Sequence, residues 1–418
     1  MRVLFTTQPT ASHWYQLVPL AQALEAAGHG VAFASTPGFC PTIEAKGFRA
    51  FRAGADETEE EAKQIREQIA RSEELPPQVP SVKYRFAGLR ADRTLPDLLD
   101  IIRDWHPHVV VREHTEFAGC VAAERAGIPH ATYQLAAPAL FFLRAVEEPL
   151  NRLLASVGLP SGTPGKPADT LYRYLLLYPR PLSLWNPEVP VPPTMHVFRY
   201  TGFKPSAEDA LPEWVGQLGE LEERPNRQVE KRPTVYATLG TVNNDRTDIL
   251  SAILAGLREE PINLILTVGR NRDPLEFGDQ PAHVHIERYI PQNTLLPRCD
   301  LVVTHGGSGT MLDALSLGLP MVIIPIAADQ PVNAQLCAEL GVARVVTPEG
   351  RTELELAQEI RKAAQEVLRE PGYRQNAQRL QKKMEELPGL AYPVALLETL
   401  AMERSDYSPG VNAGASTD

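Results

Sequence analysis

The amino-acid sequence predicts an α/β fold in which two doubly wound, Rossmann-like parallel-sheet domains follow one another along the chain. Short apolar runs alternate with helical patterns throughout, as parallel sheets built from βαβ units require. The chain has 418 residues, which is longer than a domain with a single hydrophobic core usually is. A stretch rich in charge and proline, residues 204–232, interrupts the alternation near the middle and indicates a linker.

The first half of the chain predicts strands with helices between them. The apolar helical pattern of Leu17–Ala27 stops at Gly28, a residue that commonly ends helices. Residues 57–75 form a strongly acidic helical pattern that is expected to face solvent. Prolines cluster over Pro149–Pro193, where interleaved apolar residues favour an irregular wall over the sheet. The strands are expected at Val3–Thr6, Val31–Ser35, Val109–Val111 and His130–Tyr133.

The second half repeats this alternation. Helices such as Ile249–Leu257 and Leu312–Leu317 fit between strands expected at Thr234–Thr238, Asn263–Val268, Val284–Ile286, Leu301–Thr304 and Met321–Ile324. The predicted division is a first domain over 1–203, a linker over 204–232 with a short helix around Pro212–Leu221, and a second domain over 233–390. A helix over 391–404, able to pack back on the first domain, and a disordered tail over 405–418 complete the chain.

Composition excludes several classes of function. The net charge of −11 argues against general affinity for nucleic acids or anionic membranes. No run of 18 or more apolar residues could span a bilayer, and the first residues look like a buried strand, not a signal peptide. The four cysteines are far apart, so neither a disulfide framework nor a zinc site is indicated, and a cytoplasmic protein is expected. No Asp-x-Asp triplet offers a divalent cation site.

The stretch VVTHGGSGT, Val302–Thr310, joins a predicted strand to a predicted helix through a glycine-rich turn. A helix start exposes unpaired amides and the positive end of its dipole, and glycines let a ligand approach the backbone. Ser308 and Thr310 add hydroxyl donors, and His305 ends the strand at the same crevice. These features predict an anion site that suits a phosphate, although a merely tight connection would use the same glycines.

Polar residues on both sides of this turn extend the predicted site. Upstream, Tyr289-Ile290-Pro291-Gln292 offers an aromatic face and backbone groups near the strand ends. Downstream, Asp329-Gln330 supplies a carboxylate and an amide after the next strand, and Asp313 lies one turn into the helix. Ligands of such folds bind at the carboxyl edge of the sheet. A base, a ribose, a diphosphate and a hexose would each find a partner there.

With these residues in place, the second half resembles the donor-binding half of nucleotide-sugar glycosyltransferases of GT-B fold. The branch most similar is that of the bacterial enzymes that glycosylate macrolides and other natural products, related to the UDP-glycosyltransferases. The resemblance covers Met1 to about Leu400 and is strongest over Tyr289–Ala334. It implies a GT-B architecture, with an acceptor-binding domain over 1–203 facing a donor-binding domain over 233–390 across a cleft.

The resemblance also implies roles for the residues of the predicted donor site. The diphosphate would be held by His305, the turn of Gly307, Ser308, Gly309 and Thr310, and the hydroxyl of Thr241 in the TLGT stretch. The nucleoside would be held by Tyr289 stacking on the base, Ile290 offering its backbone, and Gln292 and Asp313 beside the ribose. Asp329 and Gln330 match the pair that holds the donor sugar.

Transfer to a hydroxyl needs a general base, and a histidine fixed by a carboxylate suits this task. His13 follows the first strand in TTQPTASHWYQLVPL; a lone histidine at such a place is more often a surface or capping residue. The resemblance implies that it is the base, carried in a loop ahead of an apolar helix. Its partner is expected at Glu113, where the family has an aspartate. Because Arg112, His114 and Glu116 lie close by in the sequence, the alignment of Glu113 with that aspartate stays open by one or more residues.

The expected function is therefore inverting, metal-independent transfer of a hexose from a UDP- (or dTDP-) sugar to a hydroxyl of a hydrophobic small molecule, such as a polyketide or flavonoid aglycone. Asp313 favours a ribose with both hydroxyls and so UDP. No cofactor or metal is expected, and the protein would be a monomer or a homodimer. The acceptor would lie against Trp14, Tyr15, Leu135–Val146 and Leu171–Tyr178. Alternatives are a nucleotide-sugar epimerase or hydrolase, and a non-catalytic auxiliary protein with a vestigial donor site.

Overall fold

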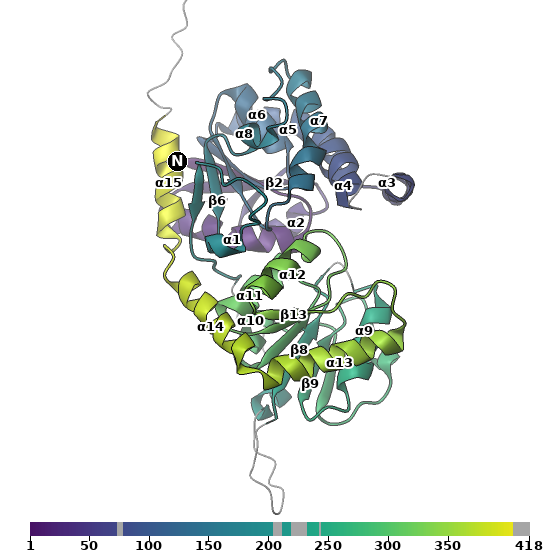
Figure 1. Ribbon diagram of the computed structural model, residues 1–418. Helices are drawn as coiled ribbons and strands as arrows, with labels where there is room; N and C mark the ends of the chain where they lie inside the picture. Colours follow the sequence, from purple (N-terminus) through teal and green to yellow (C-terminus); the bar gives the residue numbers. More distant parts are fainter. Residues whose placement is uncertain (73–77, 204–210, 219–231, 242–243, 404–418) are drawn as a thin grey trace, which may run out of the picture.

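The computed structural model describes residues 1–72, 78–203, 211–218, 232–241 and 244–403. Within these residues the chain forms two parallel sheets, with strand orders β3-β2-β1-β4-β5-β6-β7 and β10-β9-β8-β11-β12-β13. Helices cover both faces of each sheet, and the two units lie one above the other in Figure 1. Two doubly wound α/β domains, the predicted fold class, are thereby confirmed.

The N-terminal domain contains the first sheet. Its strands are β1 Arg2–Thr6, β2 Gly30–Ser35, β3 Arg49–Arg52, β4 Val109–Glu113, β5 His130–Tyr133, β6 Leu175–Tyr178 and β7 Met195–Val197. Its helices are α1 Ala11–Ala26, α2 Cys40–Glu44, α3 Glu59–Arg71, α4 Gln78–Pro80, η1 Ser81–Arg90, α5 Ala91–Trp105, α6 Ala118–Ala126, α7 Leu140–Ser156, α8 Pro167–Leu171 and the short turn η2 Leu182–Leu184.

The C-terminal domain contains the second sheet. Its strands are β8 Thr234–Thr238, β9 Asn263–Thr267, β10 Val284–Glu287, β11 Leu301–Thr304, β12 Met321–Ile323 and β13 Ala343–Val345. Its helices are α9 Thr247–Leu257, α10 Gln292–Leu295, α11 Ser308–Ser316, α12 Gln330–Glu339, α13 Glu353–Arg369 and α14 Pro371–Glu385, with short turns η3 Glu213–Gln217, η4 Pro274–Phe277 and η5 Leu296–Arg298.

Strand order places the candidate site residues at the carboxyl edges of the sheets. In the first sheet β4 pairs with β1 in parallel, with Thr6 opposite Arg112, so the turns that follow both strands meet. In the second sheet β11 pairs with β8, with Thr304 opposite Thr238. Residues that follow these strands are therefore neighbours although tens of residues of sequence separate them.

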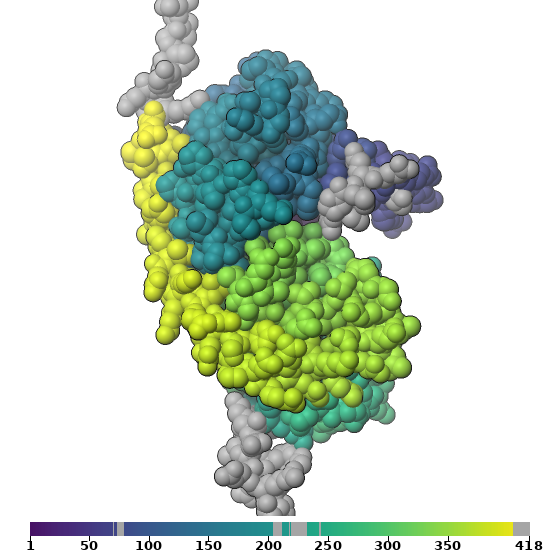
Figure 2. Space-filling view, in the orientation of Figure 1, coloured from purple at the N-terminus to yellow at the C-terminus, as the bar shows by residue number. Residues whose placement is uncertain are grey.

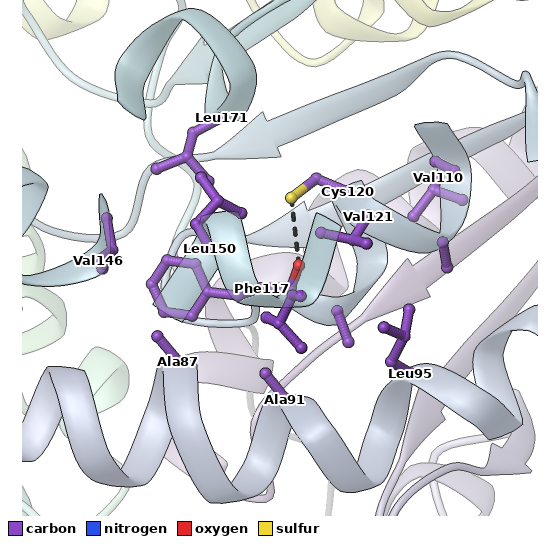
Figure 3. Close-up of a cluster of buried hydrophobic side chains, with 14 of the residues drawn as sticks. Ala87, Ala91, Leu95, Val110, Phe117, Cys120, Val121, Val146, Leu150 and Leu171 are labelled. Atoms are coloured by element: carbon purple, nitrogen blue, oxygen red, sulfur yellow. Dashed lines mark hydrogen bonds between the residues drawn. The ribbon is translucent and has the colours of Figure 1, made fainter. Parts of the chain in front are cut away.

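Each sheet is packed against its helices by buried aliphatic and aromatic side chains. Figure 3 shows one such cluster, where Phe117, Val121 and Leu150 fill the space between the first sheet and its helices. Cys120 belongs to this cluster and its thiol donates to the carbonyl of Phe117 at 3.2 Å. All four cysteines are free and buried, so they act as small apolar side chains here.

The C-terminal helix α15, Ala391–Met402, returns to the N-terminal domain. Figures 1 and 2 show α14 and α15 running along one side of both domains. Val394 and Leu397 are buried in a cluster with Trp14 of α1, and Glu398 lies 2.8 Å from the His29 ring. Contact with both domains makes this helix a link between them.

Several strands were not predicted from the sequence, namely β3, β6, β7 and β13. The proline-rich region was expected to form an irregular wall, and that expectation is wrong in part. It contains the end of α7, helix α8 and strand β6, whose residues Leu175–Tyr178 are all buried inside the sheet. Pro167 begins α8, where proline is tolerated, and α7 continues through Pro149, so composition alone misjudged the segment.

The predicted linker and tail fall mostly outside the described residues, which exclude 204–210, 219–231 and 404–418. The short linker helix corresponds to η3, and the acidic helical pattern to α3. Among the described residues, no helix is long and apolar enough to cross a membrane.

Candidate active site

His13 lies in the first turn of α1, with about a quarter of its side chain exposed. The sequence placed this histidine in a loop ahead of a helix that begins at Leu17; the structure corrects this, because α1 begins at Ala11. The polar residues of that first turn hide the helical period, which apolar residues reveal only from Leu17 onward. The helix fixes the backbone of His13 at the carboxyl edge of the first sheet.

Glu113 is the last residue of β4 and its side chain is completely buried. Its Oε1 lies 3.3 Å from His13 Nδ1, and Thr115 donates to the same carboxylate from its hydroxyl at 2.5 Å and its amide at 2.8 Å. Burial alone would raise the pKa of Glu113, but the two histidines beside it hold the pKa well below its usual range. Burial likewise opposes charge on His13, yet Glu113 raises the pKa of His13 above its ordinary value. Glu113 is therefore a charged partner for an imidazolium.

The neighbouring charged residues have different contacts. Glu116 accepts hydrogen bonds from Thr6 and from the Ala118 and Gly119 amides at the start of α6. Arg112 is fully buried and donates to the main-chain carbonyls of residues 113, 114 and 116. It thus fastens the turn that carries Glu113, and Glu113, not Glu116, contacts His13.

The glycine turn of the second domain surrounds His305, which follows β11 and is 8% exposed. A Cβ on Gly240 would come within 2.6 Å of the His305 ring, and one on Gly307 within 2.5 Å. Both glycines are therefore needed for the ring to lie between the two turns. Burial lowers the pKa of His305 to about 4, so its imidazole is neutral near pH 7. Helix α11 begins at Ser308, beside Gly307, and directs its first amides to the same place.

A chain of hydrogen bonds runs along the side of α11 expected to hold the ribose. Thr310 donates to Gln292 at 3.1 Å, and the Gln292 amide donates to Asp313 at 2.7 Å. The other oxygen of Asp313 accepts from Tyr200 of the N-terminal domain at 3.0 Å. Burial raises the pKa of Asp313 to about 6, although both donors oppose the shift. The two domains therefore share this carboxylate.

A second network holds the pair expected to bind the donor sugar. Asp329 accepts from Ser308 at 2.8 Å and from Asn333 at 2.7 Å. The amide oxygen of Gln330 accepts from two main-chain amides of its own loop, at 2.8 and 2.9 Å. Ala328 has a φ of 55°, a left-handed conformation that alanine rarely adopts. The backbone of this loop is therefore strained next to Asp329.

The remaining predicted donor residues lie at the rim. Tyr289 is 45% exposed, and the guanidinium of Arg270 lies 3.8 Å from its ring centroid. Ile290 is buried, which leaves its backbone as the part to offer a base. Thr241 is exposed on the turn after β8, next to Gly240. Gly309 is part of the first turn of α11.

The two halves of the site face each other. The charge of Asp329 contributes to the raised pKa of His13 across the interdomain space. A groove of about 360 Å³ also runs between the domains, and its lining is mixed, with Leu140, Phe141 and Arg144 of α7, Asn186–Glu188, and Val332, Gln335, Leu336 and Glu339 of α12. Of the expected acceptor surface, Trp14 and Leu175–Tyr178 are core and cannot contact a ligand. Phe142 of α7, half-buried, packs against His114 and lines the N-terminal side of the site.

Sequence reasoning missed several residues of this site, notably Thr115, Tyr200, Asn333 and Gln8, whose main-chain amide donates to Glu113 at 3.4 Å. Each is a polar residue buried beside a strand end or helix start, a weak signal that many structural residues share. Among the residues that the structure describes, no group of three or more His, Cys, Asp or Glu side chains could hold a metal ion.

Comparisons with known proteins connect this geometry to a family. Residues 22–141 match the N-terminal domain, and residues 252–399 the C-terminal domain, of the erythromycin biosynthesis protein CIII-like family. The chain is 31% identical to L-demethylnoviosyl transferase of Streptomyces niveus, over 82% of this chain and 84% of that protein. It is 28% identical to 10-deoxymethynolide desosaminyltransferase of Streptomyces venezuelae, over 96% of this chain and 98% of that protein.

Solved structures agree. The glycosyltransferase VinC in complex with dTDP superimposes with a TM-score of 0.73 at 26% identity, over 96% of this chain and all of VinC. Spinosyn forosaminyltransferase SpnP also gives a TM-score of 0.73 at 26% identity, over 96% of this chain and 99% of SpnP. The GT-B architecture that the resemblance implied is confirmed.

Proposed function

The chain belongs to the EryCIII-like family of natural-product glycosyltransferases and is itself a glycosyltransferase; on that premise we propose that it transfers a hexose with inversion, and without a metal ion, to a hydroxyl of a hydrophobic aglycone. The observation that carries the proposal is the contact of His13 with the buried, charged Glu113 at the edge facing Asp329. A base with such a partner is what attack by a hydroxyl needs.

The donor in this proposal is a nucleoside diphosphate sugar, with dTDP or UDP as the leaving group. The complex of VinC with dTDP supports the thymidine form. Asp313 and Gln292, already joined by a hydrogen bond, are the residues proposed to meet the ribose. The expectation that Asp313 favours UDP stays a prediction, because a single carboxylate can accept a hydrogen bond from the ribose of UDP or from the deoxyribose of dTDP. Gln330, whose amide oxygen is used within its loop, has its amide nitrogen to offer the hexose.

Each side chain has one task in the proposed reaction. His13, with Nδ1 facing Glu113, takes the proton of the acceptor hydroxyl as the oxygen attacks the anomeric carbon. The bond between that carbon and the diphosphate oxygen breaks on the opposite side, so configuration inverts. Glu113 stabilises the resulting imidazolium. The α11 amides, the helix dipole and His305 stabilise charge on the departing diphosphate, a task that metal ions perform in other enzymes.

The acceptor in this proposal is apolar and large. Phe142, packed against His114, offers it surface in the site, and Leu140 and Phe141 add apolar surface in the groove between the domains. The relatives named above are a transferase of desosamine to 10-deoxymethynolide and an L-demethylnoviosyl transferase, and those names support a natural-product aglycone for this chain too. Closure of the domains over both substrates would limit hydrolysis of the donor.

Turnover of dTDP-glucose and UDP-glucose against a panel of polyketide, flavonoid and anthraquinone alcohols, read by mass spectrometry, tests the proposal. Wild-type protein should give glycosides at an unchanged rate in EDTA, and His13→Ala should lose roughly 100-fold or more in rate while binding dTDP normally. Ser12→Ala, one residue earlier in α1, is the matched control and should stay active.

Three results would contradict the proposal. Loss of activity in EDTA with recovery in Mg²⁺ would exclude metal-independent transfer. Full activity of His13→Ala would exclude this base. Conversion of the nucleotide sugar in the absence of any acceptor, with no glycoside formed in its presence, would favour the epimerase or hydrolase alternative, and binding of dTDP without any turnover would favour the auxiliary protein.

A further inference from the structure

Glu113 lies between two histidines, and the proposed reaction uses only one of them. Oε1 of Glu113 faces His13 Nδ1 at 3.3 Å, and Oε2 faces His114 Nδ1 at 3.4 Å. The two imidazoles lie side by side with ring centroids 6.2 Å apart and planes 25° apart. His114 is thus a second imidazole at the centre of the site, and the resemblance assigns it no role.

The two histidines differ in charge. Burial lowers the pKa of His114, and the attraction of Glu113 does not reverse the shift, whereas the pKa of His13 is raised. A proton held by the cluster therefore lies on His13, and the positive charge there further disfavours a proton on His114. Near neutral pH His114 is a neutral imidazole, with one nitrogen that donates and one that accepts.

The surroundings of His114 decide which nitrogen does which. Its Nδ1 is wholly buried and lies 3.4 Å from the Glu113 carboxylate. A proton on Nδ1 is favoured by that carboxylate, so the accepting lone pair is on Nε2. About a tenth of the side chain is exposed, and the ring is held between His13 and Phe142, whose centroid is 5.7 Å away. The ring is held rigidly with its accepting edge turned away from Glu113.

We propose that His114 is an acceptor-binding residue, which receives a hydrogen bond at Nε2 from a second hydroxyl of the aglycone while His13 deprotonates the first. The proposal rests on the function proposed above and narrows its acceptor class. The ring centroids lie 6.2 Å apart and a hydrogen bond from a hydroxyl to a ring nitrogen is about 2.8 Å long, so two hydroxyls of one small molecule can reach both imidazoles. The acceptor class is thereby narrowed to aglycones that carry at least two hydroxyls on one carbon skeleton.

The arrangement also explains why two imidazoles share one carboxylate. An acceptor hydroxyl that donates to Nε2 polarises the imidazole and so strengthens the contact of Nδ1 with Glu113. The acceptor is then fixed at two points about His13, which selects one hydroxyl of a diol for transfer. Phe142, packed against the His114 ring, supplies the apolar surface that the carbon skeleton covers.

The experiment compares acceptors that differ only in the second hydroxyl. The probes are 1,2- and 1,3-dihydroxyanthraquinone and their monomethyl ethers, each measured for kcat/KM with dTDP-glucose and UDP-glucose. Binding of the same compounds to the dTDP-loaded protein, followed by tryptophan fluorescence, gives a second readout where turnover is slow. Wild-type protein should prefer at least one of the dihydroxy compounds to its ethers by about tenfold, the effect of one buried hydrogen bond.

His114→Phe keeps a planar ring against Phe142 but removes both nitrogens. It should abolish the preference, so that the ratio of kcat/KM, or of affinity, for the dihydroxy compound over its monomethyl ethers falls from about ten to about one. His114→Gln retains an accepting oxygen and should recover part of the preference. If His114 merely stabilised the fold, its replacement would lower kcat/KM for all acceptors by the same factor. Unaltered dTDP binding shows that each variant is folded.

Two results would overturn the inference. One is a wild-type protein that treats both dihydroxy compounds no better than their ethers. The other is a His114→Phe variant that keeps the full preference. Failure of the proposed function is distinct from these, because it would show as no glycoside from any alcohol, ethers included, with the wild-type protein.

Discussion

At the scale of single residues, the reactivity of His13 depends on the carboxylate behind it. Glu113 is excluded from solvent, yet its pKa is held well below its usual range because both faces of the carboxylate meet imidazoles and the Thr115 amide and hydroxyl donate to it. The negative charge raises the pKa of His13 although burial works against it. His13 therefore gains a proton more readily than an isolated histidine would.

Glu113→Gln tests this dependence through the pH profile of kcat/KM. The base must be unprotonated in the free enzyme, so the acidic limb of the wild-type profile should lie above pH 6.5, the ordinary pKa of histidine. Removal of the charge lowers the pKa of His13, so the limb should move to lower pH while the plateau falls about tenfold or more.

Glu44→Gln, at an exposed carboxylate of α2, is the matched control and should leave the limb in place. A limb that did not move in Glu113→Gln would show that another group sets the ionisation of the base.

At the scale of elements, the diphosphate site is made by two strand-to-helix connections that meet around one ring. His305 lies between the turn after β8 and the start of α11, in a space available only because residues 240 and 307 lack side chains. The neutral imidazole is thereby held beside the amides of α11. Neither connection would form the site by itself.

Gly240→Ala should therefore weaken binding of dTDP and UDP, measured by calorimetry, by about tenfold or more, because the new methyl group displaces the His305 ring. Gly350→Ala is the control that separates backbone strain from the clash with His305. Gly350 has a φ of +75°, close to the +72° of Gly240, but a Cβ there meets nothing within 4 Å.

Both variants should lose about 1–2 kcal/mol of folding stability from the left-handed backbone. Only Gly240→Ala should lose nucleotide affinity. Equal nucleotide affinities in the two variants would show that His305 does not contribute to diphosphate binding.

At the scale of the whole molecule, two features join the domains near the reaction site. Tyr200 of the N-terminal domain donates to Asp313, and helix α15 leaves the second domain to pack on the first. Leu397 is fully buried there with Trp14 of α1, the helix that carries His13. The base is thus supported by a segment about 380 residues further along the chain.

Leu397→Ala should lower the free energy of unfolding by about 2–5 kcal/mol, because it leaves a cavity between α15 and α1. Urea unfolding followed by fluorescence and circular dichroism measures the loss. Met402→Ala, at a side chain that is 67% exposed on the same helix, is the matched control and should change stability by less than about 0.5 kcal/mol. Equal, small losses in both variants would show that α15 does not stabilise the N-terminal domain.

Much of this molecule could be read from local patterns. Two parallel sheets follow from the alternation of apolar runs and helical periods, and the turn at Gly307 follows from glycines placed between a strand and a helix. Strands that do not stand out from their flanking sequence as apolar runs were missed: β6 lies among prolines, and β3, β7 and β13 are short and partly exposed. The start of α1 was missed because its first residues are polar.

By itself, then, the sequence determined the two-domain α/β class and the edge residues that follow its strands, since both depend on residues close together in the chain. Only the tertiary structure decided which of those residues meet. It placed Glu113 between His13 and His114, brought Asp313 within hydrogen-bond distance of Tyr200 of the other domain, and buried Trp14 in the core. The physical reason is that strand order, and the packing of helices far apart in sequence, sets these contacts, and no local pattern records them.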